Sequence, residues 1–123
     1  MKNNIPNSAE KMTLRVEYEG RLIGALTVSE KHDRKIFGML VPIDAKVVSA
    51  AFGEAMRWSY ECDMSRDCGE LDRAWRKYIP EILAITQKIR MPEVSEVIEE
   101  FAISHDFSVE ITLQCDIPQA GES

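Results

Sequence analysis

The sequence has few histidines and cysteines, no long apolar run and no internal repeat, and each absence removes a class of protein. No apolar segment approaches the roughly 18 residues that a membrane-spanning helix needs. Residues 1–10 are polar, contain Pro6 and offer no apolar stretch typical of a signal peptide. The cysteine count is 3, an odd number, so without an export signal we expect reduced thiols and a cytoplasmic protein.

The sequence also lacks the motifs of catalysis and of metal or cofactor binding. Its only histidines are His32 and His105, and neither stands in the context of a nucleophile and its base. The cysteines are too widely spaced for a structural zinc site, and the glycines form no phosphate-binding loop. We therefore predict no enzymatic activity, no metal and no cofactor. The remaining enzymatic alternative uses Cys68 or His105 as the reactive group.

Positive charge is missing from the C-terminal region. Residues 91–123 contain 8 acidic residues and no Lys or Arg, whereas the whole chain has a net charge of −6. Residues 1–90 therefore carry a net charge of +2. Because such an asymmetry bears on partners rather than on fold, it predicts a binding partner with a basic surface.

Length and composition are those of one globular domain. The chain has 123 residues, of which 45% are hydrophobic and 29% charged, so it is too apolar to be disordered. It is also long enough to bury a core without disulfides or metals. We expect residues 1–123 to form a single domain in which residues 1–10 and 118–123 are loose tails.

Alternation of apolar and polar residues predicts four strands. Placing Leu14 opposite Leu26 brings two apolar faces together and implies a connecting loop of about three residues. Ser29–Lys35 is predicted to be a charged loop, and Gly38 to mark a bulge or a close approach between strands. The predicted strands are Met12–Tyr18, Leu22–Val28, Lys35–Val41 and Phe107–Ile117.

Apolar residues at helical spacing predict three helices. Asp44 is a favourable N-cap for the first helix, which we expect to end near Cys62. The second helix has Pro80 inside it, and the unchanged apolar phase on both sides favours one kinked helix over two separate ones. Trp75 falls on the apolar stripe of this helix and is predicted to lie in the core. Pro92 is well placed as the first residue of the third helix.

The predicted elements follow the order β-β-β-α-α-α-β. This order indicates an α+β fold of two layers, in which an antiparallel sheet of three to four strands carries three helices packed on one face. The last strand is expected to pair with the first or the third strand. At a sheet edge, its length would invite pairing with a second copy of the chain, which leaves a homodimer as an alternative.

The leading functional hypothesis is a small protein-binding module that is not an enzyme, such as an inhibitor or adaptor of the kind that phages and other mobile elements encode. The predicted third helix would present glutamates around one apolar residue and dock a basic partner through them. The candidate residues of this acidic surface are Glu93, Glu96, Glu99, Glu100 and Ile103.

Two alternatives remain open. One is a nucleic-acid-binding regulatory protein, for which basic residues of a charged loop and of the second helix would contact the phosphates. The other is a small dimeric chaperone. The candidate nucleic-acid contacts are Lys31, Arg34, Lys35, Arg73, Arg76 and Lys77.

Overall fold

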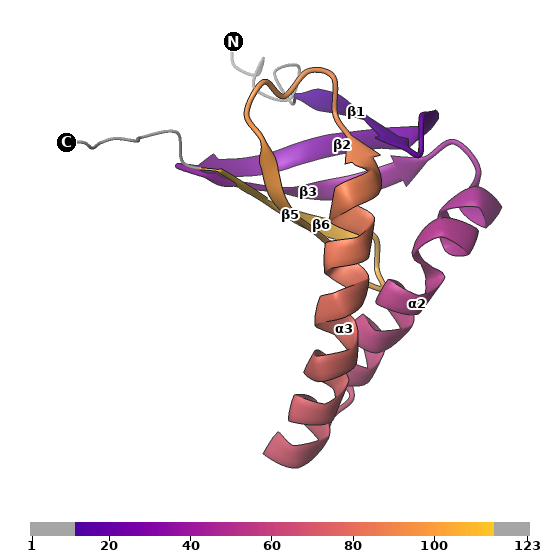
Figure 1. Ribbon diagram of the computed structural model, residues 1–123, viewed down its shortest axis with the longest axis vertical. Coiled ribbons are helices and arrows are strands. Elements are labelled where there is room, and N and C mark those ends of the chain that lie inside the picture. The colour runs from indigo at the N-terminus through magenta and orange to yellow at the C-terminus, as the bar shows by residue number, and fades with distance from the viewer. Residues whose placement is uncertain (1–11, 115–123) are drawn as a thin grey trace, which may run out of the picture.

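The structure, a computed structural model, describes residues 12–114 (Figure 1). This part of the chain contains strands β1 (Thr13–Tyr18), β2 (Arg21–His32), β3 (Lys35–Pro42), β4 (Ile89–Arg90), β5 (Ile98–Ile103) and β6 (Ser108–Leu113). Its helices are α2 (Ala45–Asp63) and α3 (Cys68–Lys88). The predicted tails, and the end of the last predicted strand at Cys115 and Ile117, lie outside the described residues.

All six strands form one antiparallel sheet in the order β4-β1-β2-β3-β6-β5. The predicted α+β content is confirmed, but the predicted architecture of three to four strands and three helices is wrong. The last strand pairs with the third, which was one of the two predicted alternatives. Because β6 also pairs with β5, it lies inside the sheet, and its edge is not free to pair with a second copy.

Both helices pack on one side of the curved, barrel-like sheet and lie side by side (Figure 1). They extend well beyond the sheet, so the end of α2 and the start of α3 form a projecting helical hairpin. Phe52 of α2 lies at the centre of the core, where its ring contacts Tyr18 of β1 at 5.1 Å and Phe101 of β5 at 6.1 Å between centroids. These aromatic contacts join both ends of the sheet to the helices.

The prediction of a third helix is wrong, because the second half of that segment forms strand β5. The prediction relied on Pro92 and on an apolar spacing that suited a helix. In the structure, β5 and β6 form a hairpin with a register shift between Ile98 and Glu100, and this shift hides the two-residue alternation of a strand. The polar residues 104–106 between two apolar runs are the turn signal that indicates the hairpin.

The N-terminal hairpin has the predicted register but a different turn. Leu14 pairs with Leu26, as expected, yet the loop is two residues long, and a register shift beside Val16 absorbs the difference. Ser29–Lys35 is not a loop, since β2 continues to His32. Gly38 allows the predicted close approach, because a Cβ there would lie 2.3 Å from the carbonyl oxygen of Thr27.

The first two predicted helices are confirmed. The side chain of Asp44 accepts a hydrogen bond from the backbone N–H of Lys46 at 2.9 Å, and α2 begins at the next residue after this cap. α3 runs without interruption past Pro80, so the segment is one helix. Its buried residues follow a helical spacing: Ala74, Tyr78, Ile82 and Ile85. Trp75 is not among them, and its prediction as a core residue is wrong.

Candidate functional site

The structure separates the residues of the predicted acidic surface. Glu93 and Glu96 lie in the segment between β4 and β5, whereas Glu99 and Glu100 lie within β5. Ile103 is fully buried in the core, so it is not accessible to a partner. These five residues therefore do not form one face of a helix, and the structure removes the docking point that the sequence pattern indicated.

Glu93 has a structural role. Its carboxylate accepts hydrogen bonds from the backbone N–H of Arg15 at 3.0 Å and from Nε of the same arginine at 2.7 Å. The arginine side chain holds the pKa of Glu93 below its ordinary value, mainly through this hydrogen bond. Because β1 pairs with β4 only at Glu17 and Tyr18, Glu93 satisfies a backbone N–H at the remaining edge of β1.

The opposite edge of the sheet, at β5, is closed by side chains of α3. Thr86 Oγ1 accepts a hydrogen bond from the backbone N–H of Phe101 at 2.9 Å, and the Tyr78 hydroxyl donates one to the carbonyl of Ile103 at 2.6 Å. Burial raises the pKa of Tyr78, so the hydroxyl stays protonated and keeps donating. At both edges of the sheet, side chains therefore occupy backbone groups that another strand would need.

The basic candidates also lie apart. Lys31, Arg34 and Lys35 surround the β2–β3 turn at one end of the sheet, whereas Arg73 and Arg76 belong to the half of α3 that projects away from it (Figure 1). Lys35 is bonded to Glu110 at 2.7 Å, and Arg76 to Asp72 at 2.8 Å. Lys77, the last of the candidates, faces the hollow between α2 and α3.

The two candidate reactive groups, Cys68 and His105, lie in different elements. His105 lies in the β5–β6 turn, and its Nε2 is 2.7 Å from a carboxylate oxygen of Asp63. Cys68 is exposed and is the first residue of α3. Burial raises the pKa of the Cys62 thiol, which makes it a poorer nucleophile.

Residues 12–114 contain no group of three or more His, Cys, Asp or Glu side chains arranged to hold a metal ion. Within the same range, neither helix combines the length and apolar character required to cross a membrane.

An apolar ridge runs along α3 on the exposed side of the helix. We use this term for residues that share a spacing of four positions and are 37–50% exposed. Residues four positions apart form a continuous row on a helix surface, and such rows are the ridges by which helices pack against one another. The members of the apolar ridge are Leu71, Trp75, Ile79 and Leu83.

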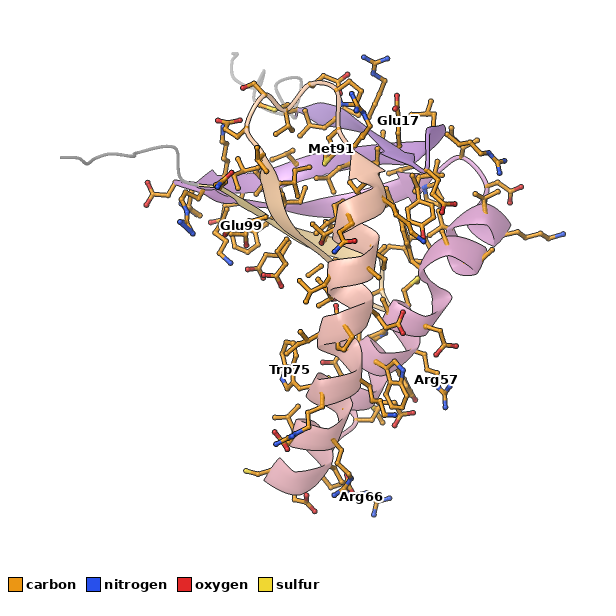
Figure 2. All side chains as sticks on the ribbon, viewed as in Figure 1. Glu17, Arg57, Arg66, Trp75, Met91 and Glu99 are labelled. Atoms are coloured by element: carbon orange, nitrogen blue, oxygen red, sulfur yellow. The ribbon has the colours of Figure 1, made fainter. Side chains whose placement is uncertain are left out.

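A groove lies next to this ridge, between α3 and the outer face of the sheet, and we call it the outer groove. Its volume is about 480 Å³. Trp75 belongs to both features, and in Figure 2 it projects from the helix pair on the side opposite to Arg57. Phe37 and Met39 approach from β3 because their side chains point to the face of the sheet that the helices leave open. Its apolar lining residues are Phe37, Met39, Trp75, Tyr78, Ile82, Ala102 and Val109.

The outer groove also has a charged part. Lys35 and Glu110 line it, but they form an ion pair with each other. Glu100 lines it as well, half-buried, and within residues 12–114 its carboxylate has no ion pair. Of the residues predicted for the acidic surface, Glu100 is the one that the structure places in this groove.

The sequence contained a signal for this site that the prediction did not use. The apolar stripe of α3 is wider than one helix face needs for packing in a domain, because Leu71, Trp75, Ile79 and Leu83 add a second row beside the buried one. Phe37 and Met39 alternate with the buried residues Ile36, Gly38 and Leu40 in β3, which leaves an apolar outer face. Such a second apolar face predicts either deeper burial or a docking surface.

Comparisons with known proteins assign no family to this arrangement. No protein-family model matches the chain, and neither the curated proteins nor the solved structures contain a match.

Proposed function

We propose that this protein is a small, non-enzymatic protein-binding module, and that its contact surface is the apolar ridge of α3 together with the outer groove. The observation that carries the proposal is the exposure of Leu71, Trp75, Ile79 and Leu83 in one continuous row beside a groove lined by both apolar and polar side chains. Exposed apolar surfaces of this kind are characteristic of interaction sites, because a domain gains nothing from leaving them in water.

Several details support a docking surface over a small-molecule pocket. The outer groove meets the ridge at Trp75, and two of its large lining residues, Trp75 and Met39, are exposed. Aromatic and methionine side chains are enriched at protein interfaces, where they bury a large area with little loss of conformational freedom. This proposal keeps the general function that the sequence suggested but replaces the predicted acidic helix by a different surface.

The experiment compares three immobilised proteins in a lysate of the organism that encodes the chain: the wild type, Leu83→Glu and Ala84→Glu. Leu83 belongs to the apolar ridge, whereas Ala84 is exposed on another side of the same helix. We expect the wild type and Ala84→Glu to retain the same protein, and Leu83→Glu to lose it, since a carboxylate placed in an apolar contact has to be desolvated. Thermal unfolding by circular dichroism verifies that all three are folded.

Retention of identical proteins by all three variants, or of none by any, would contradict the proposed surface. Both positions are on the solvent side of α3, so the substitutions should have similar small effects on stability. The comparison thus separates loss of a contact from loss of the fold.

Nucleic-acid binding is a second candidate, supported by the hollow on the other side of the helix pair. There Trp58 lies 4.8 Å from the guanidinium of Arg57 and 5.9 Å from the ammonium of Lys77, and Arg73 lines the same hollow. Aromatic rings beside cations can stack the bases of a single strand. Glu61 and Glu70 also line it and reduce its attraction for phosphate.

The test of this candidate is retention of the protein on an immobilised single-stranded oligonucleotide at low salt. We expect the wild type to be retained and Arg73→Glu to be lost. If the wild type is not retained, this candidate is eliminated.

A further inference from the structure

We infer that the segment which occupies the outer groove is a basic amphipathic helix of another protein, with apolar side chains for the ridge and a Lys or Arg for Glu100. This inference depends on the proposed function, because it names the partner of the same surface. It follows from three features of the described residues: a carboxylate without an ion pair, a lining cation that is already paired, and side-chain hydrogen bonds at both edges of the sheet.

Glu100 requires a positive partner when the groove is covered. Its carboxylate is already half-buried, lines the groove beside Trp75 and Tyr78, and has no ion pair within residues 12–114. Its negative charge also contributes to the raised pKa of Tyr78, which places the two groups within electrostatic range. Burying a carboxylate without a cation or a hydrogen-bond donor is strongly unfavourable, so an occupant with a Lys or Arg at this point is selected over a neutral or acidic one.

A second copy of this chain does not supply that cation. In a two-fold symmetric dimer the same patch is used by both copies, so an interface between two such surfaces would contain Glu100 twice. Among the described residues, Lys35 is the one cation that lines the groove of each copy, and it already forms an ion pair with Glu110. Two copies with a net charge of −6 each also repel one another.

Strand addition is disfavoured by the closed edges. At β5, the N–H of Phe101 is bonded to Thr86 and the carbonyl of Ile103 to Tyr78. At β1, Glu93 accepts a hydrogen bond from the backbone N–H of Arg15, and β4 pairs with residues 17 and 18. A peptide that added a strand would have to displace these contacts, whereas a helix needs only side-chain contacts.

The apolar ridge has the shape that a helix fits. From Leu71 to Leu83 it extends over about 18 Å of helix, which corresponds to roughly three turns of a partner. Rows of residues four apart pack into the matching groove of a second helix at a crossing angle of about −50°. The apolar residues of β3 and the carboxylate of Glu100 then lie along the flank of the docked helix.

The test uses two fluorescently labelled model peptides of about 18 residues, which is about five helical turns. One contains Leu at helical spacing with Lys elsewhere, and the other has Glu in place of each Lys. Binding is measured by anisotropy at an ionic strength of about 0.15 M, which screens non-specific attraction. The proteins are the wild type, Glu100→Lys, and Glu99→Lys as the matched control, because Glu99 is the neighbouring exposed residue and does not line the groove.

We expect the basic peptide to bind the wild type and Glu99→Lys alike, and to bind Glu100→Lys at least about tenfold more weakly. The acidic peptide should bind only Glu100→Lys. A Glu100→Gln variant, which keeps the shape of the side chain, should lie between these extremes and shows that loss of charge rather than unfolding is responsible.

Three outcomes overturn the inference: equal weakening in Glu99→Lys and Glu100→Lys, wild-type binding of the acidic peptide as tight as that of the basic one, or a dimer in light scattering that Leu83→Glu dissociates. The first two would leave the proposed function intact as long as the captured protein still requires Leu83. If protein capture does not depend on Leu83, the proposed function itself fails.

Discussion

The two apolar faces of α3 consist of the same kinds of residue, but the domain covers only one of them. Ile82 on the inner face is 2% exposed, whereas Ile79, three positions earlier, is 47% exposed. The inner face packs on the concave side of the sheet, and the outer face forms the apolar ridge. The difference shows that an apolar pattern reports what a helix can bury, while the surrounding elements decide what it does bury.

The largest expected difference in stability is between substitutions of the two isoleucines, Ile82 and Ile79. Ile82→Ala should lower the free energy of unfolding by about 2–5 kcal/mol, because it removes core contacts and leaves a cavity. Ile79→Ala should change it by less than about 0.5 kcal/mol, since the side chain already contacts water. Urea unfolding followed by circular dichroism measures both. If Ile79→Ala lowered the free energy of unfolding about as much as Ile82→Ala, the outer face would be packed like the inner one. The contrast between the two faces would then be wrong.

A smaller effect is expected at Thr86, which lies between the two faces and bonds to the edge of β5. Thr86→Val keeps the shape but leaves the backbone N–H of Phe101 without its acceptor, at a cost of about 1–3 kcal/mol. Amide exchange of Phe101 should become faster, because the edge opens more easily. Thr86→Ser retains the hydroxyl and serves as the control. Unchanged exchange in Thr86→Val would show that α3 does not close this edge.

The smallest effect is expected at the far edge of the sheet, where α3 takes no part. The pKa of Glu93 is lowered in the folded protein by Arg15, so the ion pair stabilises the fold above the ordinary glutamate pKa. This stabilisation is lost as pH falls through the lowered pKa. Thermal unfolding of the wild type and Glu93→Gln should therefore differ at neutral pH and converge in acid. Glu96→Gln, in the same segment, is the control, and an equal effect there would assign the change to net charge alone.

The fold could be predicted well where one pattern dominated and poorly where two competed. Asp44 and the spacing of apolar residues after it determined α2, and strict alternation determined β1 and β6. The prediction for residues 92–103 was wrong because Pro92, the glutamates and the apolar spacing all suited a helix. Strand β5 forms there instead, because β6 needs a partner on its second edge and Phe101 completes the core against Phe52.

The candidate site was less predictable than the fold. Glu100 was predicted to belong to an acidic helix surface, but the residues of that predicted helix form a strand and a loop in the structure. It now lies in the outer groove because a strand puts alternate side chains on opposite faces, so the side chain of Glu100 points away from the core that receives Phe101. Phe37 and Met39 are far from α3 in sequence, and no local pattern connects them to Trp75.

The sequence by itself determined the elements whose periodicity and caps are local: the helices at 45–63 and 68–88, the register of Leu14 with Leu26, and the close approach at Gly38. Only the tertiary structure decided which apolar rows are covered, which glutamate closes an edge and which one lines a groove. The physical reason is that burial and pairing depend on contacts between residues distant in the chain. Arg15 with Glu93, and Thr86 with Phe101, meet only after the sheet has curved around its helices.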